Sequence, residues 1–506
     1  MKLLLAVGLL AAVALLPNQG RAANCEDLAK LALPNATITM AQPVAAGAFT
    51  PPGENRGGPP LPVAYKDLPA FCRVAATLKP SSDSDIKVEV WLPASGWNGK
   101  FQAVGNGGWA GVISYSALAE ALYDGYATAS TDTGHVGATG SFALGHPEKL
   151  IDFGYRAVHE MTVQAKSVIA AYYGSAPRMS YWNGCSTGGR QGLKEAQKFP
   201  ADYDGIVAGA AANPRTHLSS WQIWLAQGVL DKQNYIPASK YPVIHKAVIE
   251  ACDATDGLKD GLIENPTRCH FDPKTIECKG GDEPTCLTAG QVEAARRMYE
   301  APKNPRTNER VYFGVEPGSE LGWSMLARGP EPFSAATDQF RYVVYKNPAW
   351  DWHTFKLDGD VALADKIDDD TINAVDPDMK AFLQHGGKLL MYHGWADPGV
   401  PPMASVSFFK TAEDTMGGEA KVGNSMRLFM VPGMGHCGGG EGPNQFDMMS
   451  AMTAWREKGQ APERIIASRK QDGKVVRTRP LCVHPAVAKY KGSGSIDEAS
   501  SFVCEK

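Results

Sequence analysis

The sequence contains no long block of lysine and arginine residues, and after residue 16 it contains no apolar run long enough to cross a bilayer. Its 50 lysine and arginine residues nearly balance its 54 aspartate and glutamate residues, so the formal net charge at pH 7 is -4. Nucleic acids and anionic membranes attract proteins through concentrated positive charge. We therefore expect neither nucleic acid nor membrane as a partner, and the sequence predicts no particular oligomeric state.

The cysteines lack the spacing of a zinc ribbon. Their number is ten, and an even count of this size suits five disulfides in an oxidising compartment. Spacing alone leaves the pairing open.

The N-terminus predicts secretion. Lys2 precedes an apolar run over residues 3–16, and small residues at Gly20, Ala22 and Ala23 suit a signal peptidase. A buried N-terminal helix is the alternative, but an apolar stretch that ends at Pro17 and small residues makes a poor core helix. We expect residues 1–23 to be a cleaved signal peptide and the mature protein to be secreted or periplasmic.

Strand and helix patterns alternate along the chain, which predicts an α/β fold with a mainly parallel sheet covered by helices. A proline- and glycine-rich stretch, 42–62, is expected to be an extended surface arm. The predicted strands are 88–92, 101–104, 126–131, 179–182, 207–212, 388–393 and 426–431, and the predicted helices include 153–173 and 189–199.

One segment differs from the rest of the chain in its amino-acid composition and its length. Residues 214–376 hold four cysteines and five tryptophans, and they far exceed the dozen or so residues that a crossover between parallel strands needs. We therefore expect an inserted domain at 214–376 and a catalytic domain made from 24–213 and 377–506.

The sharpest local signal is a G-x-S-x-G sequence, Gly184-Cys185-Ser186-Thr187-Gly188, between a predicted strand and a predicted helix. Small residues beside the serine let the strand turn sharply into the helix, which exposes the side chain at the carboxyl edge of the sheet. Ser186 is therefore the candidate nucleophile.

A serine nucleophile needs a histidine to take its proton and an acid to orient that histidine. Asp397 and His436 each follow a predicted strand, in the chain order serine, acid, histidine. His393 would reverse this order, and it is interpreted as a hydrogen-bonded residue at a strand end. Asp132 and His135 precede the nucleophile and are expected to shape a turn, with a supporting role at the site left open.

Two cysteines flank this candidate pair. Cys185 directly precedes Ser186, and Cys437 directly follows His436. If the serine and histidine side chains meet, their neighbours can approach within the roughly 4.4 to 6.8 Å that a disulfide requires between Cα atoms. Two unrelated buried thiols are the alternative.

These elements, Cys185-Ser186, Asp397 and His436-Cys437, resemble the tannase and feruloyl esterase family. Supporting segments are Tyr203-Asp204-Gly205-Ile206-Val207-Ala208-Gly209-Ala210, Val431-Pro432-Gly433-Met434-Gly435-His436-Cys437 and Arg479-Pro480-Leu481-Cys482. The likeness covers nearly the whole mature chain. It implies an α/β-hydrolase core with an inserted lid domain, and it implies the disulfides Cys25 with Cys72, Cys185 with Cys437, Cys252 with Cys269, Cys278 with Cys286, and Cys482 with Cys504.

An oxyanion hole takes one backbone N–H from the residue after the nucleophile, here Thr187. The second donor is expected from the glycine-rich loop Gly105-Asn106-Gly107-Gly108, and family similarity selects Gly108. A simple glycine-rich turn is the alternative for this loop.

Residues 252–262 place three aspartates within eight positions, and glycines at 257 and 261 let the loop curl. Calcium prefers such oxygen donors, although solvated Asp-Gly turns explain the spacing equally well. The resemblance implies a structural calcium in the lid, held by Asp253, Asp256, Asp260 and the carbonyl oxygens of Leu258 and Leu262. No catalytic cofactor is expected.

The resemblance further implies a serine esterase that acts on aromatic-acid esters. Feruloyl esters are the first expectation, galloyl esters the second, and terephthalate half-esters the third, since the hydrolase of the last carries an acidic residue where Thr187 stands here. A tryptophan-rich lid agrees with aromatic substrates, although aromatic residues more often fill a core. A secreted binding protein that kept the fold without turnover is the alternative of a different class.

Overall fold

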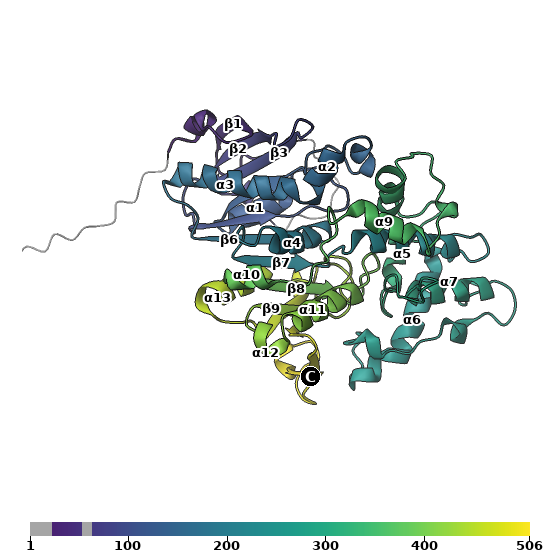
Figure 1. The fold of residues 1–506 in the computed structure, drawn as a ribbon. Helices are drawn as coiled ribbons and strands as arrows, with labels where there is room; N and C mark the ends of the chain where they lie inside the picture. The colour runs from purple at the N-terminus through teal and green to yellow at the C-terminus, as the bar shows by residue number, and fades with distance from the viewer. Residues whose placement is uncertain (1–22, 53–62) are drawn as a thin grey trace, which may run out of the picture.

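The computed structural model describes residues 23–52 and 63–506 (Figure 1). Its centre is a nine-stranded sheet with the order β1-β2-β3-β5-β4-β6-β7-β8-β9. β1, β2, β3 and β5 pair antiparallel, whereas β4 to β9 are parallel to one another. The strands are β1 (Ala36–Val44), β2 (Phe71–Leu78), β3 (Ile86–Pro93), β4 (Lys100–Val104), β5 (Ala127–Thr131), β6 (Met179–Cys185), β7 (Gly205–Gly209), β8 (Lys388–Gly394) and β9 (Met426–Val431).

Helices cover both faces of this sheet, because its central strands are apolar on both sides. In β8, Leu389 and Met391 point into one core layer while Leu390 points into the other. The first layer contains α3 (Ala157–Tyr173), α4 (Thr187–Lys198), α10 (Lys380–Gln384) and α11 (Met403–Thr415). The second contains α1 (Tyr115–Tyr123) and α13 (Met448–Lys458), and two short helices are α2 (Pro147–Ile151) and α12 (Glu419–Val422).

The long connection from β7 to β8 forms a helical unit to one side of the sheet, coloured teal to green in Figure 1. We call residues 214–376 the insertion. It buries cores of its own, one around Trp221 and Trp323 and another around Trp350 and Phe340. Its helices are α5 (Arg215–Val229), α6 (Tyr241–Cys252), α7 (Ala289–Tyr299), α8 (Ser334–Asp338) and α9 (Asp360–Asp368).

Two small antiparallel pairs end the chain. β10 (Arg464–Gln471) pairs with β11 (Lys474–Cys482), and β12 (Val487–Tyr490) pairs with β13 (Phe502–Glu505). Among the described residues, no helix combines the length and apolar character that a bilayer crossing requires.

The α/β fold with a mainly parallel sheet is confirmed. One expectation is wrong: residues 42–44 of the supposed surface arm belong to β1, an edge strand that tolerates Pro43 because a proline there removes no hydrogen bond from the sheet interior. Residues 53–62 of that arm, and nearly all of the expected signal peptide, lie outside the described residues.

All ten cysteines are paired in disulfides, and the pairing implied by the family resemblance is confirmed. The bonds are Cys25–Cys72, Cys185–Cys437, Cys252–Cys269, Cys278–Cys286 and Cys482–Cys504.

Candidate active site

Ser186 stands at the sharp turn between β6 and α4. Its backbone has φ 62° and ψ -120°, a conformation that non-glycine residues rarely adopt and that marks the nucleophile turn of serine hydrolases. Its amide donates a hydrogen bond to the Gly209 carbonyl at the end of β7, which ties the turn to the neighbouring strand. The predicted strand–turn–helix setting of Ser186 is therefore present.

The glycines beside Ser186 are required by close packing. A Cβ atom on Gly184 would lie 2.6 Å from the Gly188 backbone, and one on Gly105 would lie 2.6 Å from the Gly188 Cα atom. A Cβ atom on Gly189 would lie 2.2 Å from the Gly209 carbonyl oxygen. Larger residues would push α4 away from the sheet and from the loop that follows β4.

Asp397 lies just after β8 and is fully buried. One carboxylate oxygen accepts the amides of Gly399 and Val400, at 2.8 and 2.9 Å. The other accepts from His436 Nδ1 at 2.6 Å and from His393 Nε2 at 3.0 Å. Burial alone would raise the pKa of Asp397, but the positive charge of His436 and the hydrogen bonds from both rings hold that pKa below its ordinary value.

His436 follows β9 and is oriented by Asp397. Because its Nδ1–H donates to the carboxylate, the lone pair of the neutral ring is on Nε2, the nitrogen that a general base would use. Burial lowers the pKa of His436, but the charge of Asp397 and its hydrogen bond outweigh burial, so the pKa is raised above its ordinary value.

The disulfide between Cys185 and Cys437 joins the turn that carries Ser186 to the loop that carries His436. The two Cα atoms are 6.0 Å apart, and 252 residues separate them along the chain. Within the described part of the chain, the Ser186 hydroxyl forms no hydrogen bond, so the predicted contact with the His436 ring is not formed in this structure. Such contacts are often long in ligand-free enzymes and tighten when substrate binds.

The two expected oxyanion donors lie together. The Thr187 hydroxyl donates to the Gly108 carbonyl at 2.9 Å, and the Gly188 amide donates to the Asn106 carbonyl at 2.8 Å. Gly108 has φ +55°, in the left-handed region that favours glycine. Among the described residues, neither the Gly108 nor the Thr187 amide donates a hydrogen bond, so both N–H groups are available to a developing oxyanion.

A cavity of about 360 Å³ opens beside His436. The loop after β8 supplies Trp395 and Pro398 to its wall, the loop after β9 supplies Gly433 and Gly435, and Ser186 is not part of the wall. The insertion supplies much of the remaining surface, which is mostly apolar: Ile249, Leu262, Ile263, Leu321 and Met325.

The sequence matches a family model described as tannase and feruloyl esterase over residues 72–505. The chain belongs to the tannase and feruloyl esterase family. It is 37% identical to an uncharacterized esterase of Xanthomonas campestris over 97% of this chain and 92% of that protein, and 34% identical to a probable feruloyl esterase B-2 of Neosartorya fischeri over 98% of each.

Solved structures agree with this assignment. The crystal structure of feruloyl esterase B from Aspergillus oryzae matches with a TM-score of 0.89 and 32% identity, over 95% of this chain and 99% of that one. A tannin acyl hydrolase from Aspergillus niger matches with a TM-score of 0.77 at 22% identity, over 94% and 92%, and supports the fold alone. Together they establish the α/β-hydrolase type of fold that the sequence predicted.

Within this family member, the other histidine and acid candidates have structural roles. His393 is fully buried, and its ring contacts the Ser405 hydroxyl at 2.8 Å in addition to Asp397, as expected of a hydrogen-bonded residue at a strand end. Asp132 accepts the amides of Lys87 and Gly134, which confirms its place in a turn. Burial raises the pKa of Asp132 to about 7.

The tryptophans of the insertion do not line the cavity. Trp221, Trp323, Trp350 and Trp352 are buried in the insertion's own cores, and Trp224 packs beneath the guanidinium of Arg297. The tryptophan-rich composition therefore gives no support for an aromatic substrate. The tryptophan at the cavity is Trp395, from the loop after β8.

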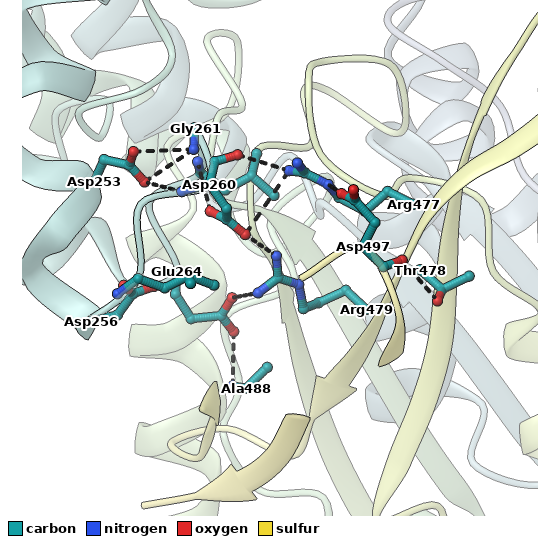
Figure 2. A network of polar contacts seen from close by, with 12 residues as sticks. Asp253, Asp256, Asp260, Gly261, Glu264, Arg477, Thr478, Arg479, Ala488 and Asp497 are labelled. Atoms are coloured by element: carbon teal, nitrogen blue, oxygen red, sulfur yellow. Dashed lines mark hydrogen bonds and ion pairs between the residues drawn. The ribbon is translucent and has the colours of Figure 1, made fainter. Parts of the chain in front are cut away.

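The aspartate-rich loop 253–262 faces the C-terminal strands (Figure 2). Asp253 accepts the Gly261 amide at 3.1 Å, and Asp256 accepts the Leu258 amide at 2.9 Å. Asp260 accepts the Leu262 amide at 3.1 Å and forms an ion pair with Arg479 of β11. Among the described residues, one group of three side chains brings its possible metal-ligand atoms within 4.8 Å of one another. That group is not in loop 253–262: it lies on α3 and α4 and in the loop after α4.

Sequence reasoning missed a charged bridge across the cavity. His245 of α6 contacts Glu320 through Nδ1 and Glu441 through Nε2, both at 2.7 Å. Burial lowers the pKa of His245, but the hydrogen bonds to both carboxylates raise it to about 9 overall. The partners are 75 and 196 residues away in sequence, so no local pattern could have indicated them.

Proposed function

We propose that this protein is a secreted serine carboxylic ester hydrolase in which Ser186 is the nucleophile, His436 the general base and Asp397 the acid that orients it. The observation that carries the proposal is the convergence of three loops. Ser186 occupies a nucleophile turn, His436 is held by Asp397 in the tautomer of a base, and the Cys185–Cys437 bond joins their loops.

The reaction uses these groups in two halves. Ser186 Oγ attacks the ester carbonyl while His436 Nε2 takes the hydroxyl proton. The backbone amides of Thr187 and Gly108 donate hydrogen bonds to the oxyanion that forms. The C–O bond then breaks, and His436 returns the proton to the leaving alcohol. Water repeats the sequence on the acyl-enzyme, which releases the acid and restores Ser186. Every proton transfer uses His436, so the chemistry needs no metal.

Stoichiometric labelling by an active-site phosphonate tests the enzyme against a binding protein that lacks turnover. We expect one label per molecule on Ser186, none on Ser186→Ala, and a loss of kcat of at least about 10⁴-fold in that variant. A folded wild-type protein that takes no label and hydrolyses no ester would support the binding protein.

We propose feruloyl esters as the preferred substrates. The support is the full-length likeness to relatives named feruloyl esterase B and a cavity whose wall of Trp395, Leu262, Ile263 and Met325 suits an aromatic ring. We expect kcat/KM to be higher on methyl ferulate than on methyl gallate or a terephthalate half-ester. A higher value on the gallate would favour the tannase alternative.

We propose further that loop 253–262 binds a structural calcium through Asp253, Asp256, Asp260 and the carbonyl oxygens of Leu258 and Leu262. The donors are all oxygen, as calcium prefers. Burial raises the pKa of Asp256, and the nearby charges of Asp260 and Asp253 raise it further, a repulsion that a cation would relieve. Arg479 already offsets part of the charge on Asp260. The ion would hold the loop, with no part in ester cleavage.

Metal analysis after dialysis tests this calcium site. We expect one calcium per wild-type molecule and a loss of that calcium in Asp253→Asn, with a lower Tm. The exposed Asp378→Asn is the control and should keep the ion. Absence of calcium from the wild type would remove the proposal.

Five disulfides support an oxidising compartment as the site of folding, which agrees with secretion. Sequencing the N-terminus of protein recovered outside the cytoplasm should give a first residue of Asn24. A mature chain that keeps residues 1–23 would contradict a cleaved signal peptide.

A further inference from the structure

A second cluster of ligating side chains lies away from the active site, between α3 and α4. His159 on α3, Glu195 on α4 and Asp202 in the loop after α4 each place one ligand atom within 4.8 Å of the other two. Glu195 follows Ser186 by nine residues, or about 13 Å along a helix. The proposed ester chemistry uses none of the three.

Glu195 is the unusual member, because its carboxylate is buried and faces another carboxylate, that of Asp202, in place of a cation. The residue is 1% exposed, and no N–H or alcohol O–H group in the described part of the chain donates a hydrogen bond to either carboxylate oxygen. No ion pair among the described residues includes it. Two cations, Arg190 and Lys166, lower the pKa of Glu195 through their charge without reaching its carboxylate. Arg190 donates to the backbone carbonyls of Gly154 and Ile372, and Lys166 donates to the backbone carbonyl of Asp202.

A buried carboxylate without a cation beside it is costly, so a proton or a cation must accompany it. Burial raises the pKa of Glu195 well above its ordinary range, and the charge of Asp202 and a hydrogen bond with that carboxyl group raise it further. Two carboxylates that face each other can share one proton, or they can jointly hold a metal ion.

The histidine favours a transition metal over calcium at this site. His159 Nδ1 contacts Asp202 Oδ2 at 2.7 Å, and the ring stacks on Phe199 with centroids 3.8 Å apart, which fixes the plane of the imidazole. One imidazole nitrogen with two carboxylates suits zinc and related transition metals, whereas calcium prefers oxygen alone.

The geometry allows an ion to enter. Zinc binds nitrogen and oxygen at about 2.0 to 2.2 Å, which places tetrahedral ligands about 3.4 Å apart, so the three side chains need only small adjustments. The side chains of His159 and Asp202 are 28% and 14% exposed, and they form a solvent-facing edge above the buried Glu195. Water would complete the coordination.

We propose that His159, Glu195 and Asp202 form a binding site for a divalent transition metal such as Zn²⁺, separate from the active site and from the aspartate-rich loop. The ion takes the place of the proton between the carboxylates. The bound ion links α3, α4 and the loop before β7 on the face of the sheet that these helices cover.

Zinc titration of the full protein, kept saturated with calcium, tests this site. Isothermal titration calorimetry of the wild type should show one equivalent of Zn²⁺ bound with a Kd in the micromolar range or tighter. Glu195→Gln preserves shape and His159→Phe preserves the stack on Phe199, and each should weaken that equivalent at least tenfold. Co²⁺ loaded in place of zinc should give visible absorption bands that both variants lose.

Glu160→Gln is the matched control, because it removes a carboxylate from the next position of the same helix. It should bind zinc within about twofold of the wild type, and circular dichroism should show all variants folded. A wild type that binds no zinc equivalent, or a Glu195→Gln variant that binds as tightly as the wild type, would overturn the proposal in favour of a shared proton.

Discussion

A single oxygen of Asp397 accepts from two histidines, His436 and His393, and this sharing fixes the acid more firmly than one contact could. Asp397→Asn should lower kcat/KM by about three to four orders of magnitude, because an amide no longer selects the tautomer with the lone pair on Nε2. Steady-state kinetics on methyl ferulate measure the effect. A loss below tenfold would show that another group orients His436.

The raised pKa of His436 sets the acid side of the pH profile. The ring must be neutral to accept the Ser186 proton, so kcat/KM should fall as pH drops through a value above the ordinary histidine pKa of about 6.5. In Asp397→Asn the charge that raises this pKa is gone, and the residual activity should persist to lower pH. An unmoved acid limb would contradict the assignment.

The positions of the proposed catalytic residues could be located from the sequence, because each follows a strand pattern. Ser186 directly follows β6, and Asp397 and His436 lie in the loops after β8 and β9, where parallel strands end at one edge of a sheet. Three features were not predictable: the hydrogen bonds of the His393 ring, the bridge at His245 and the burial of the Glu195 carboxylate. Each depends on neighbours that only the folded chain supplies.

Among the elements, α6 of the insertion is tied to the loop after β9 through His245, which is 12% exposed in its side chain. In the folded protein the pKa of His245 is raised to about 9. The bridge therefore contributes its full stabilisation of the folded state below about pH 6.5, and this contribution is lost as pH rises through 9. The difference corresponds to up to about 3 kcal/mol.

Thermal unfolding of His245→Gln and the wild type measures this bridge. The wild type should have the higher Tm at pH 6, and its advantage should shrink by pH 10. His146→Gln is a control, because His146 pairs with Asp83 at an exposed site. A Tm difference between His245→Gln and the wild type that stays constant from pH 6 to 10 would contradict the expected linkage.

Part of what the sequence did not predict has a physical cause, the exposure of β1 and of the outer half of β10 and β11, whereas β2 was missed although most of its residues are buried. β1 alternates between half-buried and exposed residues at the sheet edge, and it begins before the proline-rich stretch that suggested an irregular arm. The outer half of β10 and β11 is largely exposed, so its apolar periodicity is weak. The central strands, buried on both sides, were found because their sequences are continuously apolar.

Across the whole molecule, the Cys185–Cys437 bond closes the longest loop of the five disulfides, with a separation of 252 residues. Chain-entropy reasoning assigns such a loop about 5 kcal/mol and the eight-residue separation of Cys278–Cys286 about 2 to 3 kcal/mol. Replacing Cys185 and Cys437 together by alanine should therefore lower Tm more than replacing Cys278 and Cys286.

Removal of the two disulfides should also have different effects on kcat. The Cys185/Cys437 double variant should lose kcat at a temperature where it remains folded, because the loops of Ser186 and His436 are no longer joined. The Cys278/Cys286 double variant should keep kcat near the wild-type value. Equal activity in both variants would show that packing alone aligns the serine and the histidine.

Part of the cavity wall comes from a different part of the polypeptide than the proposed reactive groups. Loops at the ends of the strands carry the proposed nucleophile and its partners, whereas Ile249, Leu321 and Met325 line the cavity from the insertion. Amino-acid replacements on the insertion can therefore alter which ester is accepted while leaving bond cleavage intact. The insertion is therefore the place to begin directed evolution of selectivity.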